Sequence, residues 1–291
     1  MNIRSTHSPK ARTANRKKHS KKRWLKLQVL LLVMLLMAGT HTVYGQSPDD
    51  PVIPEGIGVQ QESLTGLQIG LDIETGGFWF SRNDARIPGD TGTKFDLRDL
   101  TGTSPEPFIR LNLKLGFGDR HNVRLLFAPL AKTGTGQLSE LVRFEDSEFA
   151  PSLPTEGTFR FNTYRATYRY DFFRNDRWEI GAGAAVLIRD AKIELTQGEL
   201  NERNTDLGFV PLLHFRTSAF LTDRFTAVLD AEGLIAPQGR AFDVSLHADY
   251  RLSDAFSVFA GYRFLDGGAD NDEVYSFAWI NYLKAGLSFR I

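Results

Sequence analysis

Asp230, Asp243 and His247 are the residues of this chain whose types best suit acid–base chemistry. Together they could supply a general base, a carboxylate that orients it and an acid that activates water. Each lies in a segment of alternating polar and apolar residues, where a paired or solvated side chain is expected in any case. The sequence holds no G-x-S-x-G and no H-E-x-x-H motif. We therefore predict no catalytic residue, and a membrane-embedded hydrolase or acyltransferase stays open as the alternative.

Metal and cofactor sites find little support in the residue types. The chain has no Cys, which excludes disulfides, thiolate metal sites and cysteine nucleophiles. Three of its six His lie in the first 45 residues, which we expect to be removed. Residues 266–273 carry the oxygen ligands that calcium prefers, but they lack the spacing of a calcium-binding loop. We predict no metal site and no cofactor.

The first 45 residues have the pattern of a secretory signal peptide. Met1 to Lys26 contains ten Lys and Arg and no acidic residue, and an apolar run from Leu25 to Gly39 follows. That run is shorter than the ~20 residues of a membrane-spanning helix. Cleavage is expected after Gly45, so that the mature chain begins near Gln46; an uncleaved anchor that tethers a periplasmic domain is the alternative.

The net charge of the mature chain argues against nucleic acid as a partner. Loss of the ten basic residues leaves 25 basic against 35 acidic residues, a net charge of −10. A chain with this excess of negative charge would be repelled by a phosphate backbone. Nucleic-acid binding is therefore excluded from the expected functions.

Beyond a Pro-, Gly- and acid-rich lead-in at residues 46–66, the sequence alternates between polar and apolar residues as half-buried strands do. Residues 241–252, AFDVSLHADYRL, are the clearest case, with apolar side chains on one face and polar ones on the other. Ten such strands are predicted: 67–80, 106–117, 122–131, 158–173, 177–195, 207–221, 224–236, 241–252, 256–264 and 274–291.

The predicted connections alternate in length. Short turns at 118–121, 174–176, 222–223 and 253–254 alternate with longer loops near 81–105, 132–157, 196–206, 237–240 and 266–273. Short turns on one side and longer loops on the other are typical of transmembrane barrels. The fold class predicted for residues 67–291 is all-β, a transmembrane antiparallel up-and-down β-barrel of about ten strands with both ends on the short-turn side; eight strands is the alternative.

Aromatic residues on the apolar faces distinguish this barrel from a soluble β-sandwich. Membrane interfaces select amphipathic rings, so two belts separated by aliphatic residues indicate a lipid-facing exterior and outer-membrane lipid as a partner. The belt next to the short turns comprises Phe172, Trp178, Phe225, Tyr250, Phe256 and Phe289. The belt next to the loops comprises Phe209, Phe242, Tyr262, Phe264, Tyr275 and Phe277.

With these features, residues 67–291 resemble the small bacterial outer-membrane barrels of the OmpA and OmpX kind. The last strand, YLKAGLSFRI, resembles the terminal signal that barrel-assembly machinery reads, although it ends in Ile291 where an aromatic residue is usual. The resemblance implies location in the bacterial outer membrane and the assembly machinery as a partner. It names no specific family and no extracellular ligand.

The inward faces carry charges of both signs, which we expect to pair within a narrow interior. The turn at 222–224 would place Arg216 opposite Asp230 and His214 opposite Glu232, and the turn at 253–254 would bring Arg263 near Asp243. This predicts a structural or interaction barrel with a largely closed lumen, with weak solute passage left open. The residues of the predicted lumen network are His214, Arg216, Asp230, Glu232, Asp243, His247 and Arg263.

Overall fold

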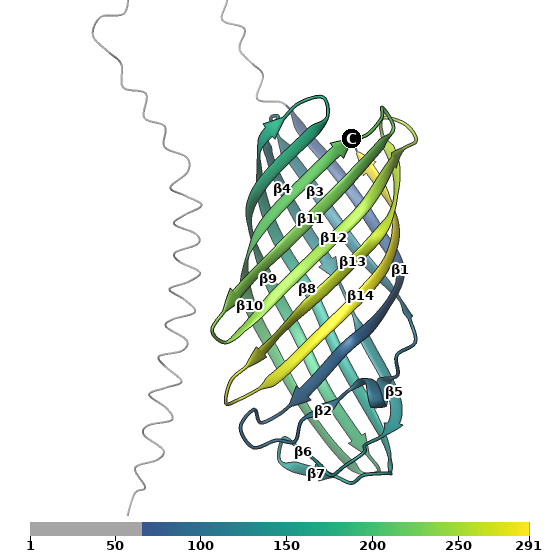
Figure 1. Cartoon of the computed structure of the whole chain (residues 1–291), viewed down its shortest axis with the longest axis vertical. Coiled ribbons are helices and arrows are strands. Elements are labelled where there is room, and N and C mark those ends of the chain that lie inside the picture. Colours follow the sequence, from purple (N-terminus) through teal and green to yellow (C-terminus); the bar gives the residue numbers. More distant parts are fainter. Residues whose placement is uncertain (1–65, 291) are drawn as a thin grey trace, which may run out of the picture. The chain divides into compact units, whose positions relative to one another are not determined.

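The computed structural model describes residues 66–290, and in these residues the chain closes into an antiparallel barrel with ten strand positions (Figure 1). The predicted signal peptide and, apart from Gly66, the predicted lead-in lie outside the described residues. The ten positions are β1 (Leu67–Arg86), β3 (Glu106–Phe117), β4 (His121–Ala128) with β5 (Ala131–Gln137), β8 (Pro154–Arg174), β9 (Trp178–Gln197), β10 (Leu200–Phe220), β11 (Phe225–Ala236), β12 (Gly239–Arg251), β13 (Phe256–Asp270) and β14 (Tyr275–Arg290).

Closure comes from β14, which pairs with β1 from Gly70–Arg290 to Arg86–Tyr275. Both ends of the barrel chain lie with the short turns, because Leu67 pairs with Phe117 directly before the β3–β4 turn. The predicted up-and-down barrel of about ten strands is therefore confirmed. Among residues 66–290, no helix is long and apolar enough to cross a membrane.

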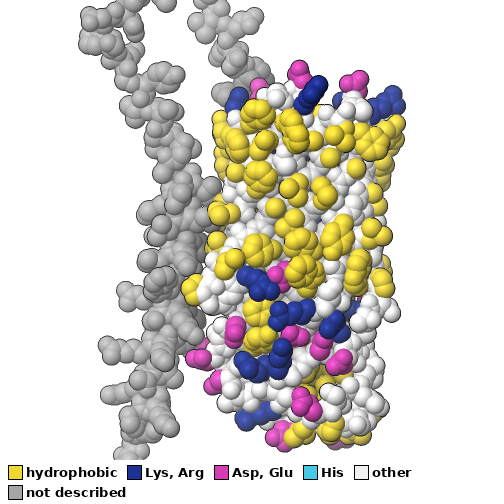
Figure 2. Space-filling model, viewed as in Figure 1, with side chains coloured by type: hydrophobic (Ala, Val, Ile, Leu, Met, Phe, Trp, Pro, Cys, Tyr) yellow, Lys and Arg dark blue, Asp and Glu magenta, His cyan; other side chains and the backbone are white. Residues whose placement is uncertain are grey.

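The strands are apolar on the outside and polar on the inside. In β1, the outward Leu71 and Ile73 are each 41% exposed, whereas the inward Asp72 and Glu74 are 8% and 2% exposed. In a protein surrounded by water this pattern would be inverted. Figure 2 shows the resulting apolar band on the exterior, with charged side chains at the short-turn rim and over a wider zone toward the loop end. The exterior is built to face lipid.

Several predicted loops are in fact strands. Residues 196–206 were expected to form a loop, but β9 and β10 continue through them and are joined only by Gly198 and Glu199. Gly198 has a φ of 62°, which suits the first position of a two-residue hairpin. Likewise, β13 extends to Asp270 through most of the loop expected at 266–273. Hydrogen-bonded pairing continues beyond the lipid, where polar residues occupy both faces and the alternation that marks a strand is lost.

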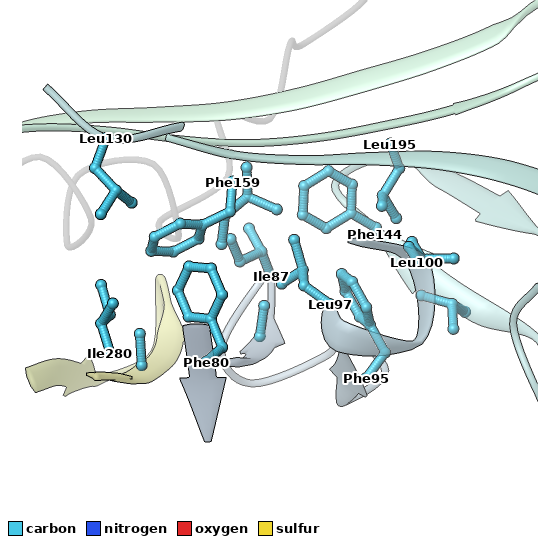
Figure 3. Packing of buried hydrophobic residues seen from close by; sticks show 14 of the residues in the cluster. Phe80, Ile87, Phe95, Leu97, Leu100, Leu130, Phe144, Phe159, Leu195 and Ile280 are labelled. Carbon is cyan, nitrogen blue, oxygen red and sulfur yellow. The ribbon is translucent and has the colours of Figure 1, made fainter. Parts of the chain in front are cut away.

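The remaining two long connections fold against the loop end of the barrel. Residues 87–105 contain the short β2 (Phe95–Asp96) and α2 (Arg98–Thr101), and residues 138–153 contain the hairpin of β6 (Val142–Phe144) and β7 (Ser147–Phe149). Their apolar side chains pack with inward residues of the barrel wall, as Figure 3 shows. We call this packing the loop-end core; its members include Phe78, Phe80, Ile87, Phe95, Leu97, Leu100, Phe144, Phe149, Phe159, Leu195 and Ile280.

Candidate functional site

The inward side chains of β10 to β13 lie in the register that the turns predict. His214 pairs with Glu232 and Arg216 with Asp230 across β10 and β11. Asp230 pairs with Ser245 on β12, which in turn pairs with Arg263 on β13. A tight turn fixes the pairing of its two strands, and period-2 alternation then fixes which side chains point inward. Local sequence therefore suffices to place these residues on one inner surface.

Contacts across the lumen connect this surface to the opposite wall. Glu232 is 1% exposed and accepts hydrogen bonds from the Thr167 hydroxyl at 2.7 Å and from Arg124 at 2.7 Å, and it also pairs with Arg165. Asp230 binds the same Arg124 at 2.8 Å and lies 3.5 Å from Arg216. The two carboxylates thus share one guanidinium that reaches them from β4.

Two further carboxylates extend these contacts toward β1 and β14. Asp243 pairs with Arg263 at 2.6 Å, with Arg165 at 3.0 Å and with Arg110 at 3.2 Å. Glu74 pairs with Lys284 at 3.1 Å and with Arg263 at 3.3 Å. The connected set, which we call the lumen charge network, has four carboxylates and six basic side chains: Glu74, Asp230, Glu232 and Asp243 with Arg110, Arg124, Arg165, Arg216, Arg263 and Lys284.

His247 was predicted to join the network, but the structure places it outside these contacts. Its ring lies 3.3 Å from the Ser245 hydroxyl and 3.5 Å from Asp249, and its centroid lies 5.5 Å from that of Phe259. His214 does remain close to the network, with its Nε2 atom 3.4 Å from Asp230. The difference comes from side-chain length: long guanidinium side chains bridge the lumen to Asp230 and Asp243, whereas the shorter imidazole of His247 contacts residues on its own strand and Phe259 on the adjacent β13.

Glu74 and Arg124 were not predicted as partners of these residues. Arg124 is separated from Asp230 by 106 residues and Glu74 from Arg263 by 189 residues. Strand alternation marks Glu74 and Arg124 as inward-facing, but register between neighbouring strands does not determine which side chains meet across the barrel. Their charge and inward position were the only available signals.

The geometry of these residues does not form a catalytic site. Asp230 and Asp243 are bound by arginines instead of orienting His247. Ser245, His247 and Asp249 follow one another on β12 at distances close to those of a hydrolytic triad. Ser245 is 0% exposed, however, so no substrate carbonyl can approach its hydroxyl in this arrangement.

A metal ion would meet a similar obstacle at the most plausible ligand cluster. Ligand atoms of His214, Asp230 and Glu232 lie within 4.8 Å of one another, and all three residues are buried. Arg124 and Arg165 already neutralise the two carboxylates. A divalent cation there would have to displace guanidiniums that are themselves buried, which makes this cluster a poor metal site.

The predicted belt next to the short turns lies on the barrel exterior. Phe172, Trp178, Phe225 and Phe256 are each more than 40% exposed. The rings form cross-strand pairs, Phe225 with Tyr250 at 5.3 Å and Phe256 with Phe289 at 4.8 Å between centroids. These rings therefore face the surroundings of the barrel at its short-turn end.

The predicted belt at the loop end is less uniform. Phe209 and Tyr262 are 45% and 41% exposed, and Phe242, Phe264 and Tyr275 are half-buried. Phe277 departs from the prediction: it is only 9% exposed, because the guanidiniums of Arg82 and Arg240 lie over its ring at 4.9 and 5.1 Å. The belt here merges into the charged zone at the loop end of Figure 2.

A closed barrel with polar residues inside, an apolar band outside and aromatic rings on its exterior defines the class of this protein: it is a transmembrane β-barrel of the bacterial outer membrane. No protein-family profile and no curated protein matches the sequence.

Solved structures with a similar course of the chain include three outer-membrane or surface proteins. The attachment invasion locus protein Ail of Yersinia pestis is 12% identical, with a TM-score of 0.35 over 77% of this chain and 99% of that chain. The outer membrane protease OmpT of Escherichia coli is 10% identical, with a TM-score of 0.41 over 77% and 97%. An outer membrane channel of Pseudomonas putida F1 is 8% identical, with a TM-score of 0.37 over 85% and 100%. Such values indicate no shared function.

The loop-end core yields a first testable prediction. Phe144 is 0% exposed and contacts Phe95 and Phe149 edge-on, so Phe144→Ala should cost about 3–5 kcal/mol of the free energy that holds the β6–β7 hairpin in place. We expect faster protease cleavage within residues 138–153 while the barrel stays folded, because no strand of the barrel pairs with that hairpin. Phe172→Ala is the matched control, since Phe172 is 52% exposed. Equal cleavage of both variants would contradict the prediction.

Proposed function

We propose that this protein is a closed outer-membrane barrel with a structural or interaction role, and that it is not a diffusion pore. The observation that supports the proposal is that two sets of packed inward side chains follow one another along the barrel. The lumen charge network crosses the barrel from β3, β4 and β8 to β11, β12 and β13. The loop-end core lies beyond it, toward the loops.

Charge pairing supports closure by the network. Seven of its ten members are at most 5% exposed: Glu74, Arg110, Arg165, Asp230, Glu232, Asp243 and Lys284. The interior of a barrel of about eight to ten strands is narrow enough for side chains to fill. In such a low-dielectric interior, mutually bonded charges hold one another in place, and moving one member leaves its partners unsatisfied. Hydrated ions would have to break these pairs to pass.

An interaction role is supported by the strands that extend past the membrane. A strand crosses the bilayer with about 9–11 residues, whereas β8, β9 and β10 have 21, 20 and 21 residues. The excess length of β9 and β10 forms a hairpin at the loop end, with polar residues such as Asn201 and Arg203 near its tip. This hairpin offers a polar surface to a partner outside the cell. Contacts with outer-membrane lipid and with the assembly machinery complete the proposed set of partners.

Single-channel recording on the refolded protein in a planar bilayer tests the proposal. Heat-modifiable migration on gels first shows that the barrel is folded. We expect no stepwise current from this folded protein. A parallel screen for lipid and peptide hydrolysis should show no turnover above that of Ser245→Ala. Stable conductance steps would overturn the closed lumen, and turnover lost in Ser245→Ala would favour the enzymatic alternative.

A further inference from the structure

The barrel wall has a break between β3 and its neighbour on the β4–β5 side. The β3–β4 ladder ends at Leu111–Phe127. Beyond this point, Glu106 to Arg110 pair only with β1, and β5 pairs only with β8; among the described strands, no ladder joins β3 to β5. Pro107 and Pro129 stand on the two sides of the break. Proline has no N–H, so neither residue can donate a backbone hydrogen bond across the break.

A cavity of about 390 Å³ occupies this break. Phe78 and Phe108 line it on the lumen side, Pro107 and Pro129 stand on its flanks, and Ile109 and Ala131 lie at its outer rim. Asn162 is the one polar side chain among the lining residues. We call this space the wall cavity. It does not open a path through the wall, because Phe78 and Phe108 are 2% and 6% exposed and belong to the loop-end core.

The wall cavity lies at the loop-end border of the apolar exterior. On its short-turn side, the outward rings of Phe127 and Tyr164 pair at 5.4 Å and are 41% and 43% exposed. On its loop side, Arg160 forms an ion pair with Asp190 at 2.7 Å on the outer surface. The buried Lys132 bounds the break farther along, because its ammonium donates to the Ser104 carbonyl at 2.7 Å. The cavity therefore faces hydrocarbon on its short-turn side and polar headgroups on its loop side.

We propose that the wall cavity binds an acyl chain of the outer-leaflet lipid that surrounds the barrel. Its lining is apolar except at Asn162, which suits a hydrocarbon chain and offers almost nothing to a polar solute. The apolar exterior continues directly into it through Ile109, which is 45% exposed, so a neighbouring lipid can enter without leaving the hydrocarbon. A bound chain also covers backbone that lacks a ladder partner, and such backbone is costly where it faces lipid.

Photo-crosslinking with a phosphatidylglycerol that carries a diazirine in its acyl chain tests this site. The mature chain is reconstituted in vesicles that contain this lipid, and adducts are mapped by mass spectrometry of peptides. We expect adducts to concentrate in residues 106–111 and 127–131. Ala131→Trp places an indole over the outer rim and should reduce those adducts several-fold.

Ala248→Trp is the matched control, because Ala248 is also exposed on the outer face of a strand but lies on β12, away from the break. This variant should leave the adducts at 106–111 and 127–131 unchanged. If Ala131→Trp does not show heat-modifiable migration, Ala131→Leu replaces it, because leucine is a smaller side chain that still covers the rim. Adducts spread evenly over lipid-facing residues, or equal adduct yields in Ala131→Trp and Ala248→Trp, would overturn the proposal. Neither result bears on conductance, so the closed lumen is tested separately.

Discussion

Glu232→Gln is expected to lower the free energy of unfolding by about 3–5 kcal/mol, the usual cost of removing one partner from a buried ion pair. Gln keeps the shape of Glu232 and a carbonyl that can still accept from Thr167. It removes the charge that faces Arg124 and Arg165, of which the Arg165 side chain is only 2% exposed. The measurement is reversible denaturant unfolding of the barrel in lipid vesicles, with heat-modifiable migration as a second readout.

Asp206→Asn is the matched control for this charge removal. Asp206 also pairs with an arginine, Arg189, but its side chain is 51% exposed, so water already screens the pair. The loss there should stay within about 1 kcal/mol. Combining Glu232→Gln with Arg165→Met should recover part of the lost stability, because the unpaired guanidinium is removed as well. A Glu232→Gln barrel as stable as Asp206→Asn would show that the network does not act as a connected unit.

The sequence was sufficient to predict those parts of the fold that depend on local order. Alternation in residues 241–252 assigns Asp243 and Ser245 to the inside, and a tight turn assigns Arg216 to Asp230; both follow from the pleat and the turn alone. Strand alternation and turn geometry do not predict which side chains meet across the lumen. Arg124 reaches Asp230 because the barrel has a particular width and stagger, which no segment of sequence encodes by itself.

The loop-end core was missed for a related reason. Phe95, Phe144 and Phe149 lie in strands of two or three residues, and Leu97 directly precedes a helix of four residues; such segments are too short for any periodicity to emerge. The sequence pattern therefore assigned these residues to loops. The number of large apolar side chains in the two loops was nevertheless a signal that these side chains are buried. The break at Pro129 was likewise included in one predicted strand, 122–131. Proline within a central strand was the signal that pairing stops there.

The proposal that the lumen charge network and the loop-end core each close the lumen leads to a prediction about conductance. A network variant, Arg165→Ala with Glu232→Ala, removes a buried pair of opposite charges and leaves space without an uncompensated charge. A loop-end variant replaces five loop residues of the loop-end core: Phe95→Ser, Leu97→Ser, Leu100→Ser, Phe144→Ser and Phe149→Ser. Barriers in series each suffice to stop ions, so each variant by itself should stay electrically silent.

The combined variant should conduct, with stepwise currents in planar bilayers that wild-type protein does not show. The barrel should survive all of these changes, because its ten positions are joined by backbone ladders that involve none of the altered side chains, and heat-modifiable migration checks this. Currents from the network variant alone would mean that the loop-end core lets ions pass. A combined variant that is folded but electrically silent would indicate a further barrier elsewhere in the lumen. That barrier would lie around the ion pair of Lys114 and Asp72, on the short-turn side of the network.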